Sequence, residues 1–230
     1  MRKILALDTA TEACSAALFD GISLIERYQV APREHNNLIL PMIKSLLAEA
    51  DWRMQDLEGL AFGAGPGSFT GVRIAAGVIQ GLALGLDLRV VGVSTLAALA
   101  EAGMRDLNVD SALAAIDARM GQVYWGAYHK TDQGHVVLSG EEVVIDPSDV
   151  PMPSMTFEAG VGSGWGTYRD VLGERLGQLP AHMLPDRFPR AASIARLGFK
   201  GFRQGLDVAG SQAQPSYLRN EVAKKPGQRQ

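Results

Sequence analysis

The feature that most constrains the fold is an internal repeat of a strand, an aspartate and a second strand. The repeated segments are LALDTATEACSAALF and AAIDARMGQVYWGAY, which place Asp8 and Asp117 in equivalent positions. Each aspartate ends an apolar run and precedes a turn, after which a second strand begins, a pattern typical of two antiparallel strands. Because the pair recurs in the second part of the chain, the sequence predicts two related halves.

Each repeat is followed by a similar order of elements. In the first half we expect strands over 3–8, 14–20, 22–30, 57–63 and 89–93, and helices over 36–50, over 70–86 and after Ser94. In the second we expect strands over 111–118, 121–129, 135–145 and 155–162, and a helical segment after Gly164. We therefore predict an α/β protein of two βββαβα halves. The second half is reduced, because its proline-punctuated segment 146–154 is too short for a long helix. The expected boundaries are 1–105, 106–218 and a loose basic tail at 219–230.

Composition narrows the functional classes. The chain has 230 residues, 47% of them hydrophobic, and can bury a large core. Its formal net charge of −3 gives no bulk attraction for nucleic acid or an anionic membrane. No apolar run reaches the roughly 20 residues of a membrane span, and Asp8 interrupts the first run too early for a signal peptide. Cys14 is the single cysteine, so we predict a soluble cytoplasmic protein without an internal disulfide.

A glycine-rich loop, FGAGPGSFTGVR, occupies residues 62–73 between a predicted strand and a predicted helix. Such loops can bind phosphate through N–H groups at the helix N-terminus. However, the loop has no lysine, which a Walker A motif requires, and Ser68 replaces the last glycine of a dinucleotide fingerprint. The alternative, which we favour, is structural: the glycines allow unusual backbone angles, and Ser68 or Thr70 caps the helix.

The predicted helix over 70–86 is apolar on almost its whole circumference. Between residues 72 and 86 its polar side chains are Arg73 and Gln80. A helix of this kind is normally buried on both sides. It also contains glycines four residues apart, each of which costs about 1 kcal/mol of helix propensity relative to alanine. Their spacing favours the close approach of another backbone. These glycines are Gly77, Gly81 and Gly85.

We therefore predict a partner-binding surface on this helix and on the helix over 36–50. Apart from Arg73 at its edge, the surface consists of apolar or small residues outside the stripes that face the core. Its predicted residues are Leu38, Met42, Arg73, Ile74, Gly77, Val78, Gly81 and Gly85. The alternative is that the second half of the chain covers this face.

Other residues give weaker functional signals. Asp8 and Thr9 end the first strand at a turn, where such residues bind phosphate or Mg²⁺ in some nucleotide-binding folds, but Asp8 can equally cap the turn. Glu12 would place negative charge beside a polyphosphate, which argues against tight ATP binding. No two histidines are four residues apart, so no helical pair of metal ligands is predicted. Cys14 is expected to be a buried thiol.

These segments are similar to a known family. The chain resembles the bacterial TsaB (YeaZ) family in LALDTATEACSAAL, PREHNNLILPMI, FGAGPGSFTGVRIAAGVIQGLALGLDLRVVGVSTLAALA, AAIDARMGQVYWGAY, GVGSGW and YLRNEVAKK. The resemblance extends over nearly the whole chain and implies the actin-like ATPase (ASKHA) fold, in agreement with the doubled element order. It also implies a TsaD-like catalytic partner, which transfers a threonylcarbamoyl group to the adenosine next to the anticodon of tRNAs reading codons that begin with A. A TsaE-like ATPase is the third member. The resemblance places a surface for self-association or for TsaD pairing on the two helices described above.

The resemblance further implies that catalysis belongs to the partner. TsaD-like chains carry an H-x-x-x-H metal pair after the strand that follows the glycine-loop helix, and here Thr95 and Leu99 stand at those positions. We therefore predict a non-catalytic subunit with no catalytic residue, metal or resident cofactor, which meets tRNA through the complex. Weak nucleotide binding at the partner interface stays open, with Asp8 and Thr9 as candidates. The alternative is an active actin-fold enzyme, such as an ATP-dependent small-molecule kinase, in which Asp8 or Asp117 positions Mg²⁺.

Overall fold

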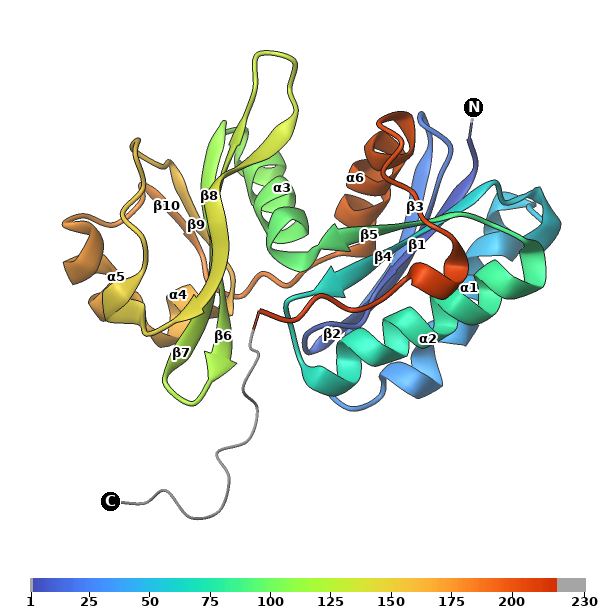
Figure 1. The fold of residues 1–230 in the computed structure, drawn as a ribbon, viewed down its shortest axis with the longest axis horizontal. Coiled ribbons are helices and arrows are strands. Elements are labelled where there is room, and N and C mark those ends of the chain that lie inside the picture. Colours follow the sequence, from blue (N-terminus) through green and yellow to red (C-terminus); the bar gives the residue numbers. More distant parts are fainter. Residues whose placement is uncertain (1, 219–230) are drawn as a thin grey trace.

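The computed structural model describes residues 2–218 and contains two five-stranded sheets side by side (Figure 1). The first has the order β3-β2-β1-β4-β5 and the second β10-β9-β6-β7-β8. The first sheet comprises β1 (Ile4–Asp8), β2 (Ala13–Phe19), β3 (Leu24–Val30), β4 (Gly59–Gly65) and β5 (Val90–Ser94). The second comprises β6 (Ser111–Arg119), β7 (Gln122–Lys130), β8 (Val136–Ile145), β9 (Ala159–Val161) and β10 (His182–Leu184). The tail expected at 219–230 lies outside the described residues.

The two sheets repeat the same pairing, which confirms the predicted relation of the halves. β1 runs antiparallel to β2 and parallel to β4, and β6 runs antiparallel to β7 and parallel to β9. The second half is reduced, as expected. The strand predicted over 155–162 contains three residues, and the segment after β8 forms only the short 3₁₀ helix η2 (Pro147–Asp149).

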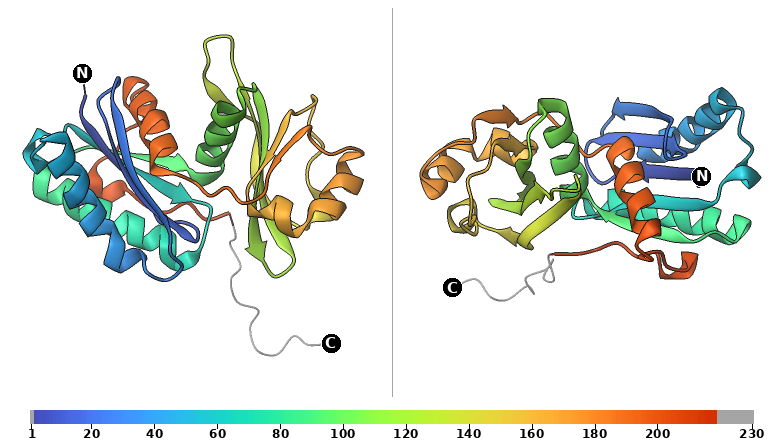
Figure 2. Two further views of the ribbon diagram at one scale, coloured as in Figure 1. Left: turned by 180° about the vertical axis from the view of Figure 1, so that it is seen from behind. Right: turned by 90° about the horizontal axis from the view of Figure 1, so that it is seen from above.

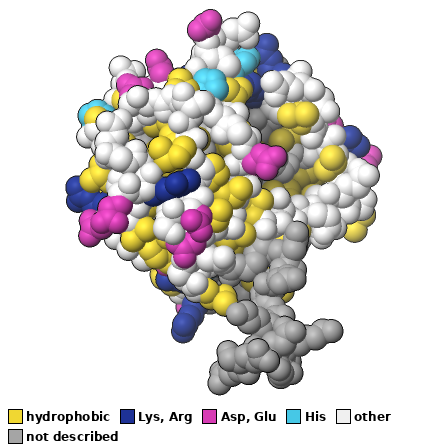
Figure 3. Space-filling view, turned by 60° about the vertical axis from the view of Figure 1, so that its left-hand side comes forward, with side chains coloured by type: hydrophobic (Ala, Val, Ile, Leu, Met, Phe, Trp, Pro, Cys, Tyr) yellow, Lys and Arg dark blue, Asp and Glu magenta, His cyan; other side chains and the backbone are white. Residues whose placement is uncertain are grey.

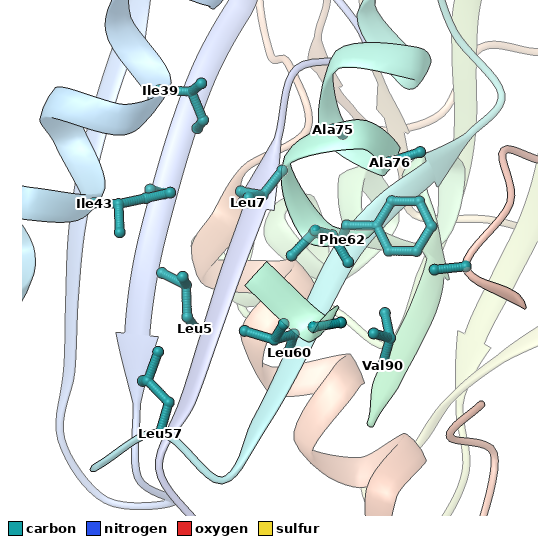
Figure 4. Close-up of a cluster of buried hydrophobic side chains, with 14 of the residues drawn as sticks. Leu5, Leu7, Ile39, Ile43, Leu57, Leu60, Phe62, Ala75, Ala76 and Val90 are labelled. Atoms are coloured by element: carbon teal, nitrogen blue, oxygen red, sulfur yellow. The ribbon is translucent and has the colours of Figure 1, made fainter. Parts of the chain in front are cut away.

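Helices α1 (His35–Ala50) and α2 (Phe69–Leu86) cover the outer face of the first sheet. Figure 4 shows the core beneath them, where Ile39 and Ile43 of α1 point toward Leu5 and Leu7 of β1. The outer face of the second sheet carries α4 (Ser163–Thr167) and α5 (Arg169–Leu176). Two further 3₁₀ helices, η1 (Met54–Asp56) and η3 (Gly210–Gln212), lie in the connections.

The last helix of each half packs on the sheet of the other half. α3 (Thr95–Leu107) shares a core with β6, β7 and β9, while α6 (Ala191–Arg203) shares one with β1, β2 and β4. The two helices also contact each other, so both lie between the sheets (Figure 2). The expected division is into 1–105 and 106–218. That division separates the two halves along the chain. In space, one helix of each half packs on the sheet of the other half, because both inner sheet faces must be buried.

A hydrogen-bonded junction joins the halves beside α3. Ser94 caps α3, since its hydroxyl accepts hydrogen bonds from the N–H groups of Leu96 and Ala97. The same hydroxyl donates to the carboxylate of Glu142 in β8, which also accepts from the Tyr128 hydroxyl. Burial of Tyr128 beside this carboxylate raises the pKa of its phenol.

α2 is long and apolar enough to cross a membrane by length and composition alone. Its packing gives a different explanation of that composition. Val72, Ala75, Ile79 and Ala83 are buried in the fold, while the opposite side of the helix stays open.

Candidate functional site

Asp8 lies in a closed environment behind the glycine loop. It is fully buried, and its Oδ1 accepts a hydrogen bond from the Ala10 N–H over 3.1 Å. Its Oδ2 has no hydrogen-bond partner among the described residues, and the Cα of Gly63 lies so close to it that no side chain fits between them. Burial raises the pKa of Asp8 to about 7. A carboxyl sealed in this way is not presented to a ligand.

Thr9 and the glycine loop hold each other in place. The Thr9 hydroxyl donates to the Gly71 carbonyl over 2.7 Å, and the Ser68 N–H donates to the Ala10 carbonyl over 2.7 Å. A Cβ at Gly71 would lie 2.0 Å from the Thr9 carbonyl oxygen. The glycines therefore allow two backbone segments to touch. Ser68 caps α2 by accepting a hydrogen bond from the Gly71 N–H, which confirms one of the two predicted caps.

Asp117 is more open than Asp8. Its Oδ1 accepts hydrogen bonds from the Arg119 N–H and from the Tyr168 hydroxyl, over 2.8 and 3.1 Å. Its Oδ2 pairs with the Arg119 guanidinium over 3.1 Å. That guanidinium also reaches across to Glu12 of the first half over 2.9 Å. Asp117 is therefore engaged in joining the halves.

Between the two turns lies a cleft of about 430 Å³. Glu12, Arg33 and Arg119 contribute its charged side chains, together with Asp117. Arg33 adopts a left-handed backbone conformation with φ of 71°, which is uncommon outside glycine. The cleft thus presents mixed charge, much of it neutralised by the Glu12–Arg119–Asp117 pairs.

Arg73 lies one turn before Gly77 on the exposed side of α2, beside Phe69 and Tyr217 of the cleft lining. Its guanidinium carbon stacks 3.2 Å above the Phe69 ring centroid and lies 5.0 Å from that of Tyr217. Both rings are exposed, by 58% and 45% respectively. This exposed aromatic cluster escaped sequence reasoning, because Tyr217 is far from α2 in the chain and no local pattern links it to Phe69. Arg119 and Glu12 were missed as a pair for the same reason.

The predicted partner surface includes an open stretch of α2 at its three glycines. A Cβ at Gly77, Gly81 or Gly85 would meet no atom within 4 Å. The predicted apolar residues of the same two helices are half-buried, and three of them pack against the core beneath: Leu38, Met42 and Val78, with Ile74 half-buried on α2. Among residues 106–218, no atom of the second half lies within 4 Å of a Cβ at these three glycines. Instead, residues 210–213 cover one flank of α2, where the Gln80 amide donates to the Ala213 carbonyl over 2.8 Å.

The side chains of the remaining candidate residues are buried in the fold. Thr95 is buried and donates a hydrogen bond to the Pro66 carbonyl, and Leu99 is buried in the core shared with the second sheet. Cys14 is buried, as predicted, and burial raises the pKa of its thiol to about 11. Within residues 2–218, no group of three or more His, Cys, Asp or Glu side chains is arranged to hold a metal ion. On the second half, exposed apolar side chains lie among charged ones (Figure 3).

Comparisons with known proteins agree with this architecture. A family model described as TsaD, tRNA N6-adenosine threonylcarbamoyltransferase, matches residues 25–152. The tRNA threonylcarbamoyladenosine biosynthesis protein TsaB of Escherichia coli is 42% identical, over 98% of this chain and 99% of that protein. TsaB of Bacillus subtilis is 31% identical, over 94% and 93% respectively. The solved structure of YeaZ from Pseudomonas aeruginosa superposes with a TM-score of 0.88 at 43% identity, covering 95% of this chain and all of that one.

The fold and these matches define a protein of tRNA threonylcarbamoyladenosine biosynthesis with an α/β, actin-like ATPase (ASKHA) fold. Within that class, the chain belongs to the TsaB (YeaZ) family. The resemblance stated from the sequence is confirmed.

Proposed function

We propose that this chain is a non-catalytic, cytoplasmic subunit required for threonylcarbamoyl transfer to tRNA, and that it binds a TsaD-like catalytic subunit through α1 and α2. The observation that carries the proposal is the open face around Gly77, Gly81 and Gly85, where a second backbone can approach without steric conflict. Glycine lowers the stability of a helix relative to alanine. This loss is offset when a partner helix packs against the glycines. Leu38, Met42, Ile74 and Val78 supply apolar contact on either side, as in the cores of many interfaces.

The same face fits a second copy of the chain, so self-association competes with TsaD pairing in this proposal. A TsaE-like ATPase completes the assembly, and tRNA reaches it through the complex. Arg73 contributes at the border of the face, next to the cleft.

A non-catalytic role is supported by how the candidate catalytic residues are used. Asp8 is sealed behind Gly63, and Asp117 is engaged with Arg119 and Tyr168. A kinase would need one of these carboxylates free to position Mg²⁺ beside a phosphate. Titration of the isolated chain with ATP and Mg²⁺ tests the alternative directly. Micromolar binding accompanied by turnover would establish an enzyme and overturn our choice.

The partner surface is tested with Gly81→Leu, which places a bulky side chain at the centre of the open face. Because no neighbouring atom lies within 4 Å of that position, the variant should fold normally. We expect it to lose co-purification with the TsaD-like protein and to elute as a monomer. Glu174→Leu, an exposed position on α5, adds similar bulk away from the face and should change neither result. Retention of the partner by Gly81→Leu would reject the proposed surface.

A further inference from the structure

The charge of α6 and the residues before it is distributed unlike that of the rest of the chain. From Arg187 to Arg203 there are five basic residues and no acidic one, in a protein whose net charge is −3. Arg196, Lys200 and Arg203 are spaced by four and three residues, so they lie along one face of the helix. At a rise of about 1.5 Å per residue, this basic row is roughly 10 Å long.

Acidic residues near α6 already have other partners. Glu26 pairs with Arg190 over 3.0 Å, Glu101 with Arg105 over 3.2 Å, and Asp106 with Arg187 over 3.1 Å. Asp207 pairs with Arg89 over 2.8 Å. Four cations on or beside α6 therefore have no carboxylate of residues 2–218 within ion-pair distance. They are Arg2, Arg196, Lys200 and Arg203.

The surroundings of these cations differ: Glu101, Glu26 and Asp106 partly offset the charge of Arg196, whereas Lys200 experiences only the effect of burial. Burial lowers the pKa of the Lys200 ammonium, and burial together with the nearby Arg105 lowers the pKa of Arg196. The Arg196 guanidinium donates to the Ala192 carbonyl, and the Arg2 guanidinium stacks 4.4 Å from the Phe202 ring centroid. Partial desolvation of a cation with no ion pair costs free energy, which a bound anion would offset.

We propose that the basic row of Arg2, Arg196, Lys200 and Arg203 is a docking surface for the sugar–phosphate backbone of tRNA. This inference rests on the proposed function, since the RNA is the substrate of the assembled complex. An extended row of cations matches a chain of phosphates better than it matches one small anion. The row also leaves the partner surface free, because α6 packs on the opposite face of the first sheet from α1 and α2.

The test measures tRNA binding by the assembled complex at several salt concentrations. The triple variant Arg196→Gln, Lys200→Gln, Arg203→Gln removes three charges while retaining most of the side-chain length. We expect its tRNA affinity to fall by about tenfold or more at low salt. The slope of log affinity against log salt should become shallower by roughly 2, since each phosphate contact contributes about 0.7 to 0.9. The double variant Lys200→Gln, Arg203→Gln spares the half-buried Arg196 and covers the case in which the triple variant unfolds.

The control removes three exposed arginines elsewhere: Arg53→Gln, Arg169→Gln and Arg175→Gln. It should leave the affinity and its salt slope close to those of the wild type. Assembly with the TsaD-like protein is measured on the same samples. Equal tRNA binding by an intact α6-variant complex would overturn the inference while leaving the proposed function standing. Loss of partner binding by the α6 variants would also overturn it, and would identify the row as a protein interface. Failure of the wild-type chain to bind the TsaD-like protein would instead reject the proposed function.

Discussion

The turns after β1 and β6 are built alike but have different surroundings. In both, an aspartate Oδ1 accepts a hydrogen bond from the N–H two residues later, at Ala10 and at Arg119. Asp8 is then enclosed by the glycine loop, whereas Asp117 is met by the polar side chains of Arg119 and Tyr168. The shared local sequence pattern therefore determines the conformation of the turn. It does not determine the burial or the partners of the aspartate carboxyl group.

The difference arises from the loop that faces each turn. In the first half, Gly63 approaches the Asp8 side chain and Gly71 approaches the Thr9 backbone. In the second half, the equivalent glycine, Gly162, lies against the carbonyl of Ala115, two residues before Asp117. The following helices differ as well, since α2 has 18 residues and α4 has five. The first turn is thus sealed by a long helix and its loop, and the second stays open for an ion pair between the halves.

Substitution of Gly71 should give the largest effect. In Gly71→Ala the new Cβ would lie 2.0 Å from the Thr9 carbonyl oxygen, so the loop and the first turn must separate. We expect a loss of about 4 kcal/mol or more in the free energy of unfolding, as for severe overpacking combined with broken hydrogen bonds. Urea denaturation of the purified chain measures it.

Gly77→Ala is the matched control on the same helix. Because that position is open, alanine should raise the free energy of unfolding by up to about 1 kcal/mol through helix propensity. If both variants lost similar stability, the close contact between loop and turn would not be the reason that position 71 requires glycine.

The sealed carboxyl of Asp8 should make stability depend on pH. Its pKa is raised from 3.8 to about 7 in the folded chain, so the folded state holds a proton that the unfolded state releases. The resulting stabilisation is complete below the unfolded pKa and is lost as pH rises through the folded one. One pKa unit corresponds to about 1.4 kcal/mol, so roughly 3 kcal/mol should disappear between about pH 4 and pH 7.

Asp8→Asn removes this titration. The difference in free energy of unfolding between wild type and variant, measured by urea denaturation from about pH 4 to pH 8, isolates the contribution of Asp8 from that of other groups. We expect this difference to change steadily in favour of the variant as pH rises. A difference that stays constant with pH would mean that Asp8 is not sealed from solvent.

These two turns also show how far the sequence could predict the structure. The repeat around Asp8 and Asp117 was visible because strand and turn signals are local, and so the doubled α/β fold was predicted correctly. The cap at Ser68 followed from the same kind of signal. The packing of α3 and α6 on the sheets of the opposite halves was not predicted. Both helices are amphipathic, and a hydrophobic pattern does not determine which sheet a helix covers. The pairing of Arg119 with Glu12 depends on how two distant turns meet, which no local pattern encodes.

The smallest expected effect concerns the ion pair at the open turn. The Arg119 side chain is 73% exposed and that of Glu12 is 38% exposed, so solvent screens their attraction. A double-mutant cycle with Arg119→Gln and Glu12→Gln should give a coupling energy below about 1 kcal/mol, and this value should shrink as salt rises from about 0.05 to 0.5 M. A coupling of several kcal/mol that persists in high salt would contradict this expectation and would show that the second turn is as well shielded as the first.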